Sequence, residues 1–181
     1  MRKLPHSVVV LTTAQQPTSS APQPIRRGMT LSSFTTLTLT PNPIVTFNIR
    51  RPSLTLSALR SSPSHRFNIQ VLNANPLGAQ IADAFTRGNK DGDPFQALMQ
   101  RQADSLEIVE QEGAGLMFRS EGVKRTLGCK ILGQGKGFVD VGDHVVVMAE
   151  VVDIYEPFGD AGMDNGSLGV RGLAYVDGGY I

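Results

Sequence analysis

The sequence lacks the features that mark several special classes of protein. It has no tryptophan and only one cysteine, Cys129, so no internal disulfide can form. Apolar neighbours of Cys129 indicate a small buried side chain rather than a reactive thiol. The formal net charge of +1 provides no broad cationic field for holding phosphate backbones. We therefore expect no nucleic acid partner.

Long hydrophobic runs are also absent. The longest apolar stretch, Val145 to Ile154, is interrupted by Glu150 and Asp153, whereas a membrane-spanning helix needs about 20 apolar residues. The run Val8 to Leu11 is too short for the core of a signal peptide. We expect a soluble, intracellular protein without membrane contact. The cytoplasm is the expected compartment, with the mitochondrial matrix as the alternative if a transit segment precedes Met1.

Strand patterns dominate the first part of the chain. The sequence predicts a strand at Val8 to Thr13, a Pro/Ser-rich loop at about residues 14–27, and a second strand from Thr30 to Leu39. The nearly continuous apolar run Ile44 to Ile49 predicts a short strand buried on both faces. A further strand is expected at Arg66 to Leu72.

Three helices have recognisable starts. Ser53 is a good N-cap after Pro52. Asn75 and Asp93 are also N-cap candidates, and each is followed by a proline in the first helical position, Pro76 and Pro94. Residues 106–176 read mainly as strands, with turns expected at Gly133 to Gly137 and at Asn165-Gly166. Because strands and helices do not alternate, residues 1–181 predict a single, mainly β domain: an antiparallel barrel with inserted helices.

One segment has the chemistry of an anion site. A helix beginning after Ser53 presents unpaired N–H groups, Ser53 and Thr55 add hydroxyls, and Arg50 and Arg51 lie just upstream. A phosphate monoester fits this donor set. The alternative, an ordinary serine cap with solvated arginines, is left open by the local sequence.

Two further clusters accompany it. Gly28 precedes Thr30, Ser32 and Ser33, whose small side chains would let a planar ligand approach a strand, although an exposed Thr/Ser-rich strand is the alternative. His144 enters an apolar strand directly after Gly142-Asp143, where a histidine can be structural or catalytic.

Together these clusters resemble the flavin reductase-like domain of the FMN-binding split barrel group. The resemblance is carried by RKLPHSVVVLTT, RGMTLSSFTTLTLTPNPIVTFNI with a serine shortly after, FNIQVL, VGDHVVVMAEV and LAYVDGGY, in this order along nearly the whole chain. It implies an antiparallel Greek-key split barrel that forms a homodimer, with flavin near the subunit interface. The loop after the first strand is longer, and the segment before that strand shorter, than the family pattern.

The resemblance also implies site residues. Thr30, Ser32 and Ser33 match the segment that lines the flavin ring, and Asn48, Arg50 and Ser53 match the region that holds the ribityl chain and phosphate. Leu31 and Thr55 complete the set of residues predicted to bind the flavin. His144 matches a histidine near the nicotinamide site and is the catalytic candidate. No metal ligands are expected.

The function that this implies is NAD(P)H-dependent reduction of flavin. FMN is the expected cofactor, with FAD as the alternative, and NADH or NADPH is the expected co-substrate. The electrons would pass to free flavin, to a partner enzyme that accepts the reduced flavin, or to oxygen. Two other readings remain open: a flavin-binding or flavin-free split-barrel interaction subunit without turnover, and a heme- or pyridoxal-type phosphate-binding barrel.

Overall fold

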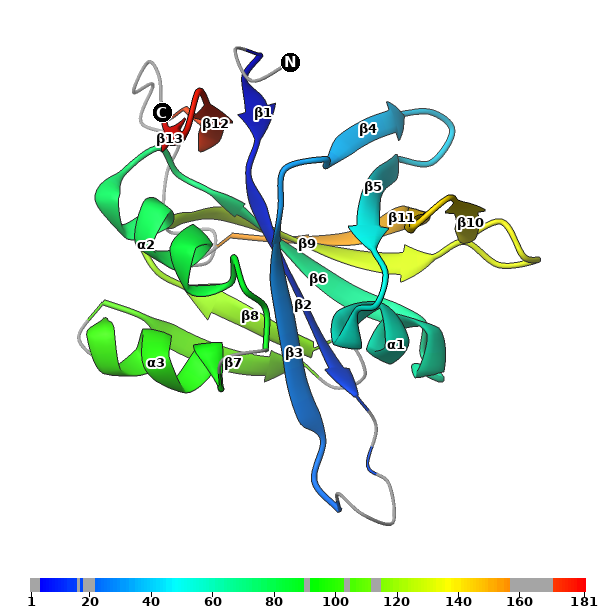
Figure 1. Ribbon diagram of the computed structural model, residues 1–181, viewed down its shortest axis with the longest axis horizontal. Helices are drawn as coiled ribbons and strands as arrows, with labels where there is room; N and C mark the ends of the chain where they lie inside the picture. Colours follow the sequence, from blue (N-terminus) through cyan, green and yellow to red (C-terminus); the bar gives the residue numbers. More distant parts are fainter. Residues whose placement is uncertain are drawn as a thin grey trace.

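The computed structural model describes residues 4–15, 17, 22–89, 92–102, 105–111, 115–156 and 171–181. Its centre is a curled antiparallel sheet in the order β3-β2-β6-β9-β11-β5-β4, with β10 paired to β11 (Figure 1). The predicted turn at Asn165-Gly166 lies outside the described residues. The strands are β2 (Val9–Gln15), β3 (Ile25–Leu31), β4 (Thr35–Thr38), β5 (Ile44–Arg50), β6 (Arg66–Leu72), β9 (Val123–Ile131), β10 (Phe138–Val141) and β11 (His144–Tyr155).

Smaller elements surround this sheet. Strands β1 (His6–Ser7), β12 (Ala174–Val176) and β13 (Gly179–Tyr180) form a three-stranded sheet, and β7 (Glu107–Gln111) pairs with β8 (Gly115–Arg119). The helices are α1 (Leu54–Ser61), α2 (Pro76–Ala84) and α3 (Pro94–Arg101). Each starts at its predicted cap: the side chains of Ser53, Asn75 and Asp93 accept hydrogen bonds from first-turn N–H groups. Among the described residues, none of the helices is long and apolar enough to cross a bilayer.

The sheet encloses one apolar core and supports a second on its outer side. Phe47, Phe67 and Ile69 lie inside the barrel, where Leu56 and Leu59 of α1 close one end. The second core lies between the sheet and a layer made of α2, α3 and β7–β8. Its centre is an aromatic trio, Phe85, Phe95 and Phe118, with ring centroids 4.9 to 6.1 Å apart. The predicted mainly β, antiparallel split barrel is confirmed.

Two strand predictions and one loop prediction need correction. The stretch Thr30 to Leu39 forms two strands, because the chain leaves β2 at Leu31 and pairs with β5 from Thr35. Strand β5 is buried on one face only: Val45, Phe47 and Ile49 point into the barrel, while Asn48 and Arg50 are exposed. The loop expected at residues 14–27 is shorter, since β2 continues to Gln15 and β3 starts at Ile25.

Candidate functional site

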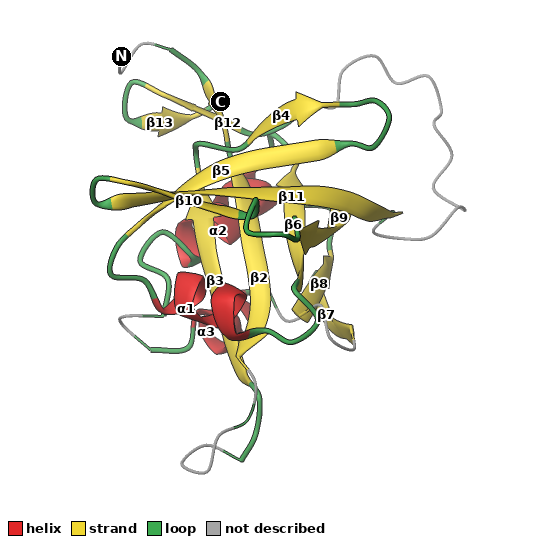
Figure 2. Ribbon diagram, turned by 90° about the vertical axis from the view of Figure 1, so that its right-hand side faces the viewer, coloured by secondary structure: helices red, strands yellow, loops and turns green. Residues whose placement is uncertain are grey.

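The outer face of β5 and β11 brings predicted site residues together. Arg50 pairs directly with His144 across the two strands, and Asn48 pairs with Val146. Directly paired residues of antiparallel strands project from the same face, so these four side chains lie on one surface. Figure 2 shows β4, β5, β11 and β10 side by side, and among the described residues no helix lies over the face turned to the viewer. Arg50 and His144 are therefore neighbours on an open sheet face.

A carboxylate joins these two residues. Asp143 Oδ2 accepts a hydrogen bond from Arg50 Nε at 2.9 Å, and Asp143 Oδ1 lies 2.7 Å from His144 Nδ1. Hydrogen bonds from His144 first, and from Arg50 second, lower the pKa of Asp143. With Asp143 bonded to Nδ1, Nε2 is the ring nitrogen left to face a ligand.

The start of α1 lies next to this group in the chain. Ser53 Oγ accepts a hydrogen bond from the Leu56 N–H at 3.2 Å, as an N-cap does. Thr55, whose hydroxyl was expected to face the same anion, is only 4% exposed. The anion-binding potential of this end therefore rests on the N–H groups of the first turn, Ser53 and Arg50.

Arg51 has a structural role at this site. Its backbone N–H donates to Asp143 O at 2.8 Å, its Nη2 donates to Gly142 O at 2.5 Å, and its Nη1 lies 3.2 Å from Asp140 Oδ1. Asp140 also pairs with Arg60 of α1 at 3.4 Å. The sequence suggested a second cation for a phosphate at Arg51, but its polar groups hold the β10–β11 hairpin against the β5–α1 junction.

The predicted ring-binding segment is divided between two environments. The Ser33 hydroxyl accepts a hydrogen bond from the Asn48 N–H at 2.9 Å, which places it beside the Asn48–Arg50 face. The Thr30 hydroxyl donates to Ala82 O at 2.5 Å, and its N–H donates to Phe85 O at 3.1 Å. Leu31 is 3% exposed within the barrel core, whereas Ser32 is exposed. In this segment, Ser32 and Ser33 lie nearest to the open surface.

Gly28 makes a close approach to an aromatic ring. A β-carbon at this position would lie 2.7 Å from Cδ1 and Cε1 of Phe85 and 3.2 Å from Cζ of Phe95. The sequence led us to expect a planar ligand against this glycine. Instead, the lack of a side chain lets the second core pack against β3.

Asp143 was missed among the candidate residues, because the pair Gly142-Asp143 reads locally as a turn. Its position next to His144 in the chain was the available signal. Its contact with Arg50 could not be found in this way, because 93 positions separate the two residues.

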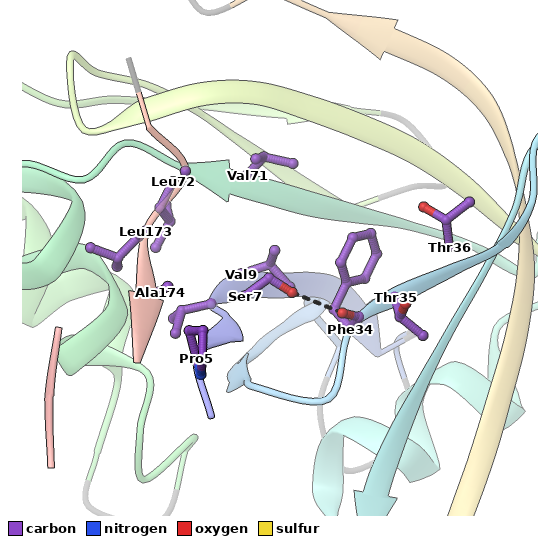
Figure 3. A pocket seen from close by; sticks show the side chains of 12 residues that line it. Pro5, Ser7, Val9, Phe34, Thr35, Thr36, Val71, Leu72, Leu173 and Ala174 are labelled. Atoms are coloured by element: carbon purple, nitrogen blue, oxygen red, sulfur yellow. Dashed lines mark hydrogen bonds between the residues drawn. The ribbon is translucent and has the colours of Figure 1, made fainter. Parts of the chain in front are cut away.

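A separate cavity of about 400 Å³ opens near the β3–β4 connection (Figure 3). Phe34, Val9, Leu72 and Leu173 give it mainly apolar walls, and Ser7 Oγ donates to Phe34 O at 2.8 Å. None of the predicted site residues lines it. The candidate site is thus an open surface, and this cavity is distinct from it.

The donor set on the open surface fits a flavin phosphate. Arg50 offers a guanidinium, Ser53 caps a helix start, and the amide of Asn48 suits the hydroxyls of a ribityl chain. His144 lies on the same face and is the direct cross-strand partner of Arg50. The residues present can therefore hold an anionic ligand and set an imidazole beside it.

Solved structures share this arrangement of strands. The chain aligns with an NADH:FAD oxidoreductase of Streptomyces globisporus in complex with NAD and FAD fragments, at 22% identity and a TM-score of 0.68, over 99% of this chain and 86% of that one. The flavin reductase HpaC complexed with NADP⁺ aligns at 22% identity and a TM-score of 0.66, over 100% and 92%. A protein of Sinorhizobium meliloti aligns at 22% and 0.68 over 98% of this chain, which spans only 49% of that one. At these identities the likeness establishes the fold, an antiparallel split barrel.

The family is established by a sequence match. The family model described as the flavin reductase like domain matches residues 1–180. The chain belongs to the flavin reductase-like domain family. This membership supports an oxidoreductase function of the flavin reductase type.

Proposed function

We propose that the chain is an NAD(P)H-dependent flavin reductase that binds FMN on the open face of β5 and β11. The observation that carries the proposal is the cross-strand pair of Arg50 and His144 beside the Ser53-capped start of α1. It combines groups for an anion and an imidazole on one surface. Flavin supplies the chemistry of accepting a hydride from the nicotinamide and passing the electrons on.

The protein residues would bind and orient. Arg50 and the first-turn N–H groups of α1 hold the phosphate, Asn48 bonds the ribityl chain, and Ser32 and Ser33 lie along the ring system. Thr30, Leu31 and Thr55 would contribute mainly by holding the strand and helix in place, because their side chains are buried or already bonded. His144 would orient the nicotinamide or relay a proton through Nε2. The family resemblance supports these roles.

Flavin binding and turnover test the proposal in two steps. FMN added to the purified protein should bind with quenching of its fluorescence, and NADH or NADPH should then be oxidised. FAD is tested in parallel. A protein that binds neither flavin contradicts the proposal.

His144→Ala separates binding from turnover. Because the histidine is assigned to the nicotinamide side, turnover should fall about 100-fold, within the range for losing a positioned acid–base group, while FMN stays bound. Unchanged turnover would remove His144 from the mechanism. Flavin binding without nicotinamide oxidation in the wild type would instead favour the non-catalytic flavin-binding subunit.

We further propose that a second copy of the chain covers this face. A flavin site normally buries most of its ligand between walls, whereas Arg50 and Asp143 are 76% and 59% exposed. Val139 and Val141 of β10 add exposed apolar surface in the same cross-strand rows. Sedimentation should give a dimer that Val141→Glu weakens, and a wild type that stays monomeric with flavin bound would contradict this.

A further inference from the structure

The arginines before α1 and in its last turn are already paired. Arg50 contacts Asp143 at 2.9 Å, and Arg51 and Arg60 share Asp140 at 3.2 and 3.4 Å. Both carboxylates come from the β10–β11 hairpin. A phosphate that binds at this end of the site must therefore interact with arginines that already have carboxylate partners within the protein.

Arg50 and Arg51 differ in how many contacts hold their guanidinium groups. Arg51 is tied to the hairpin through Gly142 O as well as Asp140, so it is committed to the fold. Arg50 donates through Nε to Asp143, which uses one of its five N–H groups. In the described part of the chain, this is the one hydrogen bond that its guanidinium makes. Arg50 is therefore the arginine that a ligand can recruit.

Asp143 has contacts of its own besides Arg50. Its other carboxylate oxygen bonds His144, and its backbone carbonyl accepts from the Arg51 N–H. These bonds hold Asp143 independently of Arg50, so it is in position to compete with a phosphate for the guanidinium. It is ionised at neutral pH, because its neighbours favour the charged form.

We propose that Asp143 sets the affinity for phosphorylated flavin by competing with the flavin phosphate for Arg50, so that the flavin exchanges instead of remaining bound. The inference rests on the proposed flavin site. Exchange requires that the phosphate anchor be weak, and an internal carboxylate weakens it without removing the arginine. Riboflavin has no phosphate, so its affinity is independent of this competition.

Fluorescence titrations of FMN and riboflavin with the full chain test the proposal. Asp143→Asn keeps the shape and the acceptor for His144 but removes the charge. It should tighten FMN binding about 3- to 5-fold, the scale of one exposed charge pair, with riboflavin within about twofold. Asp153→Asn is the matched control, because Asp153 also pairs with an arginine, Arg66, at 3.3 Å. Asp153 lies about 30 Å further along the extended strand β11, and is therefore distant from the phosphate end of the site. Its FMN-to-riboflavin affinity ratio should equal that of the wild type.

A double-mutant cycle distinguishes competition from simple repulsion. With Arg50→Gln in place, Asp143→Asn should no longer tighten FMN binding, because nothing is left to compete for. A gain that persists without Arg50, or an unchanged affinity ratio in Asp143→Asn, overturns the proposal while leaving flavin binding intact. If the wild type binds neither flavin, the proposed function fails first and this inference with it.

Discussion

Gly28 of β3 lies against the ring of Phe85, so closely that a β-carbon at residue 28 would be 2.7 Å from two ring carbons. Phe85 follows the last turn of α2, and its carbonyl accepts the N–H of Thr30. The strand that leads into the proposed ring-binding segment is therefore positioned by the second core. Effects of mutations at Gly28 should appear first in stability.

Gly28→Ala should lower the free energy of unfolding by about 1–3 kcal/mol, because the added methyl group overpacks the aromatic trio. Urea denaturation measures this. Gly133→Ala is the matched control, since no atom lies within 4 Å of a β-carbon there, and should change stability by less than about 1 kcal/mol. Equal effects at the two glycines would contradict the packing role of Gly28.

Ser53 has a structural role and a proposed binding role, which two substitutions separate. Ser53→Ala should cost about 1 kcal/mol of stability through loss of the N-cap, whereas Ser53→Gly should cost only a few tenths. Both remove the hydroxyl, so both should weaken FMN binding if it contacts the phosphate. Stability is measured by urea denaturation and binding by fluorescence. Full FMN affinity in Ser53→Gly would restrict Ser53 to capping.

Arg51→Ala should loosen the β10–β11 hairpin. It removes the hydrogen bond to Gly142 O and the ion pair with Asp140, but keeps the backbone bond to Asp143 O. Amide hydrogen exchange should accelerate at residues 138–144 without a comparable change in β6. Arg66→Ala, which breaks a surface ion pair with Asp153, is the control and should leave the hairpin protected. Unchanged exchange in Arg51→Ala would contradict the role of Arg51 in holding the hairpin.

Cys129 should resist modification until the chain unfolds. The residue is 1% exposed, and burial raises the pKa of its thiol from 9.0 to about 12. A thiol reagent at pH 8 should therefore label the native protein only at the rate of opening. Rapid labelling of native protein would contradict this.

The same pKa predicts the direction of a pH effect. The folded state holds the thiol proton more tightly than the unfolded state, so the resulting stability is fully present below about pH 9 and is lost as the pH rises toward 12. The stability difference between wild type and Cys129→Ala should be constant below pH 9 and change above it. A difference that does not vary up to pH 11 would contradict the assignment.

Local patterns predicted much of the fold because they act over a few residues. Ser53, Asn75 and Asp93 cap their helices through local contacts, since each side chain accepts a hydrogen bond from an N–H two or three positions ahead. The strand pattern of Ile44 to Ile49 was recognised, but not that one of its faces stays open. What covers a strand depends on distant segments, and none of the helices in the described part of the chain lies over this one.

The sequence by itself determined where the helices begin, where most strands lie, that Cys129 is buried, and which residue types offer phosphate and imidazole chemistry. Only the tertiary structure decided which of those groups meet. Pairing of β5 with β11 joins Arg50 to Asp143 and His144 across 93 positions. Packing of α2 turns Gly28 and Thr30 toward the core, although their local sequence suggested a ligand. The stretch from Gly28 to Ser53 therefore contains both residues that face a core and residues that face the open surface, because contacts distant in sequence assign each residue its neighbours.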